Sequence, residues 1–290
     1  MMEGKFVELS LNRAVLNPQA SAARVVRSAH GAGFRYIEMS AHRLKQATEN
    51  REARSLLRSG EILPVHGGWS LRLNWERKRF TEGLAAAEGE MAFAAQWGSR
   101  SGALILPQSF SGAPDGISEE DLLDRIGRTA DVARRNGLAL VLEYIGIGEA
   151  QPKAMAYGTL AGALRVVRLV GRSNVGVLLD SYHWYTSDGA IGDIALISRD
   201  TPLFVHLNDA PAGDPRRLDD TMRELPGSGV IDLLGFLGAL SDIGYQGPVS
   251  IELKHPSLHA MAPESAAEEA YRAGMRVLTD MQTPRQSETA

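Results

Sequence analysis

Short apolar runs alternate with stretches of helical apolar spacing along almost the whole chain. Eight of these runs have the length and the Val, Leu and Ile content of buried parallel strands. In chain order they are Phe6–Leu9, Tyr36–Met39, Leu63–His66, Ala103–Leu106, Leu138–Glu143, Val175–Asp180, Leu203–His206 and Val249–Glu252. This alternation leaves few folds open, because parallel strands need a crossover between one strand and the next.

The intervening stretches carry the signals of helices. Two of them place apolar residues on one helical face. These stripes are Ala22, Val25, Val26 and Ala29, and then Phe80, Leu84, Ala87, Met91 and Ala94. Ser118 followed by Asp121 is typical of a helix N-cap. Glycines that would end a helix before the next strand stand at Gly31, Gly137, Gly171 and Gly244. The sixth expected helix, near Ile191–Ile197, is short and poorly patterned.

Eight strands that alternate with helices predict a (β/α)8 TIM barrel, and 290 residues suit one barrel of this kind. The rival fold is an open doubly wound sheet, which would carry a glycine-rich GxGxxG turn after its first strand, and no such turn follows the first run. No linker, repeat or low-complexity segment divides the chain. We therefore expect a single barrel domain over residues 1–282 and a frayed C-terminal tail over residues 283–290.

Composition and charge argue against several kinds of partner. The net charge is -4 and the longest basic run is Arg77–Arg79, which disfavours a nucleic acid. No apolar stretch approaches the ~20 residues of a membrane helix, and the first residues, MMEGKFVELS, lack the apolar stretch of a signal peptide. The chain has no cysteine, and so no disulfide and no thiolate ligand or nucleophile. We expect a cytoplasmic protein.

Four of the apolar runs end in a residue that binds metals: Glu143, Asp180, His206 and Glu252. In a barrel, the carboxyl ends of the strands meet at one mouth, where active sites form. Three carboxylates and an imidazole there are a ligand set for one divalent ion, with Mn²⁺ favoured and Mg²⁺, Co²⁺ or Zn²⁺ as alternatives. One such residue could merely cap a strand or pair with an arginine. Four at equivalent positions favour a shared metal site.

Two residues near these strand ends are candidates for substrate contact. His183 could hydrogen-bond a substrate oxygen, ligate a second metal or pack against Trp184. Arg223 could bind a substrate hydroxyl or carboxylate through two donors, or it could pair with Glu224 or Asp220 at the surface.

A turn, Pro226–Gly229, follows this arginine and leads into a helix expected near Ile231. The backbone amides of the turn could also hold an anion at that helix N-terminus.

Further candidates lie near other strand ends. His66 ends the third run, and Trp69 is close enough to line an apolar wall of a pocket. Lys254 follows the last run and could bring a positive charge into the mouth. The alternative for His66 is a satisfied core histidine, and for Lys254 a packed aliphatic stem. Glu38 and Gln108 also lie near strand ends.

Taken together, these motifs resemble the xylose isomerase-like barrel superfamily, and most of all its sugar phosphate isomerase/epimerase branch. The resemblance rests on Glu143, Asp180-x-x-His183, His206 with Asn208-Asp209, Arg223 before PGSG, and the closing GYQGPVSIEL. That branch includes ketose 3-epimerases, hydroxypyruvate isomerases and inosose dehydratases. The resemblance implies that Glu143, Asp180, His206 and Glu252 ligate one divalent ion and that His183 and Arg223 contact the substrate.

The activity that the resemblance implies is a metal-dependent sugar isomerase or epimerase. Glu143 and Glu252 would move a proton alpha to a carbonyl of a small polyhydroxy substrate, a sugar or a cyclitol, through an enediolate. After His206 the chain runs Leu-Asn-Asp-Ala-Pro, where ketose 3-epimerases typically have a Gly-Glu pair, which disfavours a free-ketohexose 3-epimerase. Members of the branch often form homo-oligomers, so a dimer or tetramer is expected.

The main rival function is a lyase at the same site. It would be an inosose or dehydroshikimate-type dehydratase, or an enzyme that cleaves a 3-keto C-glycoside. An endonuclease-IV-like hydrolase is disfavoured, because it would have a histidine where this chain has Gln108. A non-catalytic barrel subunit would be expected to have lost a ligand, and all four are present.

Overall fold

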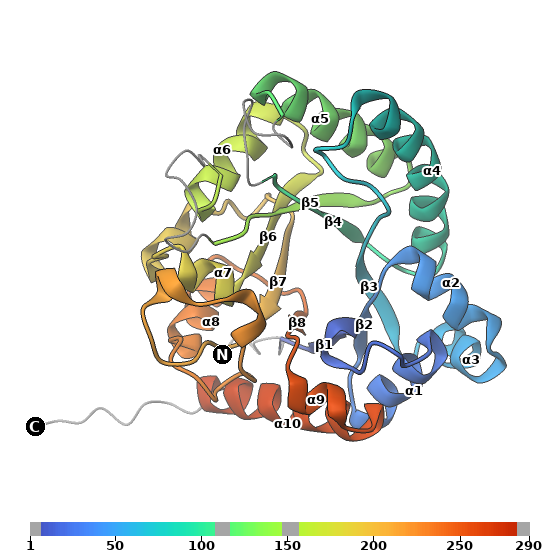
Figure 1. Ribbon diagram of the computed structural model, residues 1–290, viewed down its shortest axis with the longest axis vertical. Helices are drawn as coiled ribbons and strands as arrows, with labels where there is room; N and C mark the ends of the chain where they lie inside the picture. The colour runs from blue at the N-terminus through green and yellow to red at the C-terminus, as the bar shows by residue number, and fades with distance from the viewer. Residues whose placement is uncertain (1–6, 108–116, 147–156, 283–290) are drawn as a thin grey trace, which may run out of the picture.

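Eight parallel strands close into a barrel, as the alternation of strands and helices predicts (Figure 1). The computed structural model of the protein describes residues 7–107, 117–146 and 157–282. Each strand pairs with the next one along the chain, and β1 pairs with β8 to complete the ring. The strands are β1 Leu9–Asn12, β2 Tyr36–Glu38, β3 Leu63–Gly68, β4 Ser101–Ile105, β5 Ala139–Glu143, β6 Val175–Asp180, β7 Leu203–Leu207 and β8 Val249–Ile251.

The helices form an outer layer around this ring (Figure 1). They are α1 Ala22–Ala32, α2 Ala41–Glu49, α3 Arg51–Ser59, α4 Arg77–Gln96, α5 Glu119–Arg135, α6 Leu160–Val170, α7 Ser181–Thr186, α8 Leu233–Asp242, α9 Pro256–Ala260 and α10 Pro263–Gln282. Short 3-10 helices are η1 Arg13–Val15, η2 Ile191–Leu196, η3 Pro215–Arg217 and η4 Asp220–Met222. The poorly patterned sixth crossover is thus the short α7 followed by η2. Within the described residues, no helix is both long and apolar enough to cross a membrane.

The predicted helical faces are confirmed. The stripe on α4 supplies all the buried residues of that helix, and the stripe on α1 is likewise buried. The side chain of Ser118 accepts the amide of Asp121 and so caps α5. Three of the four glycines predicted to end helices have a positive φ at a helix end: Gly137, Gly171 and Gly244.

The prediction for Gly31 was wrong. This glycine lies inside α1, whose C-cap is Gly33, two residues later, with φ 102°. The amide of Gly33 donates to carbonyls of the last helical turn, which requires the left-handed conformation that glycine adopts without strain.

The first strand begins later than predicted. β1 is Leu9–Asn12 and not Phe6–Leu9, and Phe6 itself lies outside the described residues. The apolar pattern pointed to the wrong segment because two of the four strand residues, Ser10 and Asn12, are buried polar side chains. The other predicted strand ends lie within about two residues of the observed ones. The predicted tail over residues 283–290 and Gln108 also lie outside the described residues.

The inside of the barrel has its own small apolar cluster, apart from the larger core. Val65, Val141, Leu178 and Phe204 pack together and come from four different strands, so they fill the interior. The ring of His66 stacks on Phe204, with centroids 4.1 Å apart. Because side chains fill the interior, the barrel is a packed core and not a pore, and the space for a ligand lies at its mouth.

The tight approach of β6 to the segment before β7 gives a test of the fold. A Cβ on Gly176 would overlap the backbone carbonyl of Pro202. Gly176→Ala should therefore lower the free energy of unfolding by about 1–3 kcal/mol, as overpacking does. Gly238→Ala is the matched control, because its Cβ on α8 would meet no atom within 4 Å. It should leave stability unchanged or raise it by up to ~1 kcal/mol. Urea unfolding measures both, and equal effects of the two substitutions would contradict the observed packing.

Candidate metal centre

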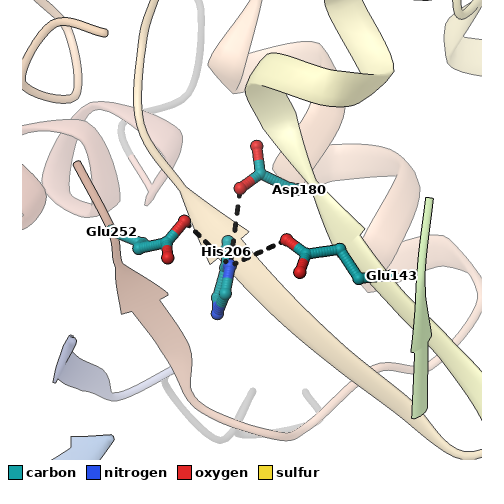
Figure 2. Close-up of side chains that lie close together, drawn as sticks. All are labelled: Glu143, Asp180, His206 and Glu252. Carbon is teal, nitrogen blue, oxygen red and sulfur yellow. Dashed lines mark ion pairs between the residues drawn. The ribbon is translucent and has the colours of Figure 1, made fainter. Parts of the chain in front are cut away.

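Four strand ends bring acidic and imidazole groups to one point at the mouth of the barrel (Figure 2). Glu143 ends β5, Asp180 ends β6, His206 lies in β7, and Glu252 directly follows β8. One ligand atom from each of them lies within 4.8 Å of all the others. Among the described residues, this is the one group of such side chains close enough to share an ion. It is the quartet that the strand-end pattern predicted.

The imidazole of His206 faces the three carboxylates of the quartet with its Nδ1 atom. Nδ1 lies 3.8 Å from Glu143, 3.4 Å from Asp180 and 3.3 Å from Glu252, and it makes no hydrogen bond (Figure 2). An imidazole nitrogen that is buried and aimed at three carboxylate oxygens is the donor arrangement that a divalent cation satisfies. The residues present therefore fit one metal ion.

The carboxylate of Glu38 contacts the opposite edge of the His206 ring, at Nε2. His206 Nε2 lies 3.1 and 3.0 Å from the two carboxylate oxygens of Glu38, which can only accept. Nε2 must therefore carry the proton and donate it, which leaves the lone pair of a neutral ring on Nδ1, toward the quartet. A carboxylate behind a histidine ligand is a common way to fix the tautomer and the ring orientation. The sequence placed Glu38 at a strand end without assigning it this role.

Arg223 is the positive charge among these carboxylates, and its side chain is 5% exposed. Its Nη1 donates to Asp180 Oδ2 and to Glu252 Oε2, both at 2.8 Å. Its second terminal nitrogen, Nη2, contacts Asp220 at 2.6 Å and His183 Nε2 at 3.0 Å. The predicted ion pair with Asp220 thus exists, but the guanidinium also spans two members of the quartet.

Asp180 is oriented by donors on several sides. Its Oδ1 accepts the amides of Tyr182 at 2.8 Å and His183 at 3.2 Å, since Asp180 also caps α7. The side-chain amide of Asn208 donates to both oxygens of Asp180 and to the carbonyl of Glu252. These contacts fix the position of the Asp180 carboxylate in the absence of an ion. Because the carboxylate is already ordered, less conformational entropy is lost when an ion binds.

The quartet has strongly perturbed pKa values. Burial, reinforced by the charge of Glu252, raises the pKa of Glu143 to about 8. Burial alone would also raise the pKa of Glu252, but His206 and Arg223 outweigh it and lower that pKa to about 2. The same balance, with Arg223 as the main charge, places the pKa of Asp180 well below its ordinary value. Burial would lower the pKa of His206, yet Glu38 and Glu252 raise it well above its ordinary value.

Two cavities meet at the quartet. The larger has a volume of about 620 Å³, and Glu38, Glu143, His206 and Glu252 are among its lining residues. The rest of its lining is mostly apolar, from Trp69, Leu71, Leu73, Leu104, Ile105, Leu106, Pro107 and Leu178, with the polar residues Arg72 and Asn74. The smaller cavity, of about 110 Å³, has the polar side chains His183, Asp220, Arg223 and Lys254. Glu143 and Glu252 line both cavities and therefore stand between them.

The predicted substrate contacts fall into two groups. Trp69 lines the large cavity, and His183, Arg223 and Lys254 line the small one, as substrate contacts would. His66 lies elsewhere: it is fully buried, its Nδ1 is 2.7 Å from Ser101 Oγ, and it lines neither cavity. His66 is therefore a core residue but not a fully satisfied one, because its Nε2 atom makes no hydrogen bond and lies 4.0 Å from Glu38 Oε1.

The amides of the turn Pro226–Gly229 do bind an anionic group, but that group is a side-chain carboxylate of the protein itself. The carboxylate of Asp209 accepts the amides of Gly227 and Gly229, at 3.0 and 2.9 Å. The alternative that these amides bind an external anion is therefore wrong.

Comparisons with known proteins agree with this geometry. The profile of the xylose isomerase-like TIM barrel family matches residues 26–281. The inosose isomerase of Bacillus subtilis is 29% identical over 157 residues, which cover 54% of this chain and 55% of that enzyme. The 3-dehydroshikimate dehydratase of Pseudomonas aeruginosa is 31% identical over 163 residues, which cover 55% of this chain and 25% of that enzyme. The chain thus spans about half the length, or less, of these relatives.

Among solved structures, the IOLI protein with a zinc atom superimposes on this chain with a TM-score of 0.80 at 23% identity. The superposition covers 94% of this chain and 99% of that one. This likeness shows the fold.

Glu38 gives a first test of the centre. Glu38→Ala removes the acceptor behind His206, so the ring is no longer held with Nδ1 toward the quartet. The affinity for Mn²⁺ or Zn²⁺ should fall ~10–100-fold, the usual effect of losing such a partner. Isothermal titration calorimetry measures it, with the exposed Glu82 changed to Ala as a control. An unchanged affinity in Glu38→Ala would show that His206 is not a ligand held in this way.

Proton release gives a second test. Without a metal ion, the pKa of about 8 keeps Glu143 protonated at neutral pH. Because a ligand gives up its proton when it binds a metal, the affinity should rise with pH through about 8. Titrations below, near and above this pH, in buffers of different ionisation enthalpy, measure both the affinity and the protons released. A pH-independent affinity would contradict the prediction.

Proposed function

Because the chain belongs to the xylose isomerase-like TIM barrel family, we propose that it is a divalent-metal-dependent isomerase or epimerase of a small sugar or cyclitol. Its relatives include an inosose isomerase and a 3-dehydroshikimate dehydratase. The reaction proposed is the movement of a proton on the carbon next to a carbonyl group.

One observation carries this proposal: the His206 Nδ1 atom, without a hydrogen bond, faces three carboxylates that lie within 4.8 Å of one another. Burying Glu143, Asp180 and Glu252 together adds repulsion, which without a metal has to be offset by Arg223, by His206 and by a proton on Glu143. A divalent ion explains why they converge. Mn²⁺ is the first candidate for a set of mostly oxygen ligands, and Zn²⁺ is an alternative, since the IOLI structure holds a zinc atom.

The two glutamates are placed to move the proton. Glu143 ends β5, and Glu252 follows β8, three strands further around the ring; both residues line both cavities. A substrate carbon between them is open to one carboxylate from each side. Glu252 is tied to Arg223 at 2.8 Å, which weakens it as a base. We therefore assign the removal of the proton to Glu143, which would be ionised once it holds the ion. Protonated Glu143 can return the proton to the same face of the substrate, whereas Glu252 would deliver a proton to the other face only after taking one up from water.

The remaining polar groups bind and orient the substrate. A bound divalent ion would hold the substrate oxygens next to the reacting carbon and offset the negative charge that forms there. His183 lines the small cavity beside Arg223, so its ring can contact a substrate hydroxyl there. That cavity, with about 110 Å³, suits a short end of the substrate, and the rest lies in the larger one.

A lyase is the second candidate, because 3-dehydroshikimate dehydratase is among the relatives. Removal of the same proton by Glu143, followed by loss of a hydroxyl on the next carbon as water, gives an enone. Dehydration of an inosose or a dehydroshikimate would follow this course. Cleavage of a 3-keto C-glycoside would begin with removal of the same proton but would break the C–C bond to the aglycone, which leaves in place of the hydroxyl. The ligand set serves both reactions equally, so the product decides between them.

The decisive experiment is a product assay with Mn²⁺ on a panel of inososes, ketoses and 3-dehydroshikimate. An isomerase gives products of unchanged mass, and a dehydratase gives an ultraviolet-absorbing product that has lost water. In deuterated water the isomerase product takes up one deuterium at the reacting carbon. Loss of turnover with a chelator and recovery with Mn²⁺ would support the role of the ion, whereas full turnover in a chelator would rule it out.

Substitution of the proposed base tests the assignment of roles. Glu143→Gln keeps the size of the side chain but cannot take a proton, so kcat should fall by at least ~10²-fold, the low end of the contribution of a general base. The exposed Glu88→Gln serves as the control. Normal turnover by Glu143→Gln would exclude the mechanism.

A further inference from the structure

The carboxylate of Asp209 is fully engaged by backbone amides. Oδ2 accepts from Gly227 and Gly229 at 3.0 and 2.9 Å, and Oδ1 accepts from Ile231 and Ala210, both at 2.9 Å. The residue is 1% exposed. Among the described residues it forms no ion pair, so these amides alone stabilise its charge. One side chain thus fixes the turn Pro226–Gly229 through two of its amides and the segment that follows it through the amide of Ile231.

The backbone of Asp209 fixes the other side of the same loop. Its amide donates to the carbonyl of Glu224 at 2.9 Å, and the amide of Glu224 donates back at 2.8 Å. Arg223 is the residue directly before this bridge. The loop that carries Arg223 is therefore attached to the end of β7 through Asp209, three residues beyond the metal ligand His206.

Arg223 connects this loop to the metal centre through its side chain. It reaches Asp180 and Glu252 from the loop, and its guanidinium lies 5.1 Å from the centre of the Tyr182 ring. Asp220 and Tyr182 hold the guanidinium group, whereas Asp209 holds the backbone from which the side chain extends. A shift of that backbone would move the donor away from the two carboxylates.

We propose that Asp209 is a positioning residue, which places Arg223 so that Asp180 and Glu252 are set for the divalent ion. This inference rests on the proposed function, because its effect is on the metal centre. In Asp209→Asn one oxygen becomes an NH₂ group, which faces backbone N–H groups and cannot accept from them. The turn must then shift or leave donors unpaired.

The test is a double-mutant cycle with Mn²⁺ alone as the probe. The affinity for Mn²⁺ is measured by calorimetry for the wild type, Asp209→Asn, Arg223→Gln and the double variant. Arg223→Gln should weaken binding ~10–100-fold, as the loss of a partner of metal ligands does. Asp209→Asn should weaken binding at least fivefold, and the double variant should bind no more weakly than Arg223→Gln, since both changes remove the same contact.

Two further variants separate positioning from folding. Asp232→Asn is the matched control, because this aspartate also accepts a backbone amide, that of Gly235, but caps α8 away from Arg223. It should bind Mn²⁺ like the wild type. Gly229→Ala displaces the same turn without changing any charge, because its Cβ would overlap the carbonyl of Ala210. It should weaken binding as Asp209→Asn does, and it takes that variant's place if Asp209→Asn does not fold.

The outcomes are distinct. If Asp209→Asn binds Mn²⁺ within twofold of the wild type, or if the two effects multiply in the double variant, Asp209 does not act through Arg223 and the inference fails. The Co²⁺-loaded proteins provide a spectroscopic check, since Asp209→Asn and Arg223→Gln should shift the visible absorption bands alike. A wild type that binds no divalent ion would instead overturn the proposed function.

Discussion

Repulsion between buried carboxylates is the constraint around which the mouth of this barrel is built. Glu38, Glu143, Asp180 and Glu252 surround one imidazole, and in the apolar surroundings of the strand ends each would raise the pKa of its neighbours. Without an ion, the protein offsets this charge with Arg223 and with protons on Glu143 and His206. Each of those protons occupies a position where a cation can replace it. The electrostatic cost of the site is thus also what would give the site affinity for a metal.

The fold keeps these groups together because they project from a rigid, closed sheet. Asp180 and His206 are paired in register on adjacent strands, so their distance follows from the pairing of β6 with β7. The apolar cluster inside the barrel prevents the strands from relaxing away from each other. Polar contacts then set the side chains, with Glu38 behind His206 and Asn208 beneath Asp180. In a site held in this way, repulsion between the charged groups lowers the free energy of unfolding of the protein. Binding of the ligand raises it again.

The barrel and the quartet were predictable from the sequence because both follow from local patterns. Buried parallel strands are apolar on both faces, and a polar residue at the end of such a run stands out. Where a strand turns polar side chains inward, as β1 does with Ser10, the pattern failed and the strand was placed too early. Glu38 was seen at a strand end but not assigned, since nothing in its sequence neighbourhood indicates that it contacts His206, 168 positions away.

By itself, the sequence determined the alternation of strands and helices, and the four candidate ligands with their order around the ring. These are properties of short segments, whose hydrophobic spacing and chemistry are legible without knowledge of their neighbours. Only the tertiary structure decided which way the imidazole faces, that Arg223 spans Asp180 and Glu252, and that Asp209 occupies the amides of the turn. Those facts depend on distances between residues far apart in the chain, and such distances are set only when the closed barrel brings the strand ends together.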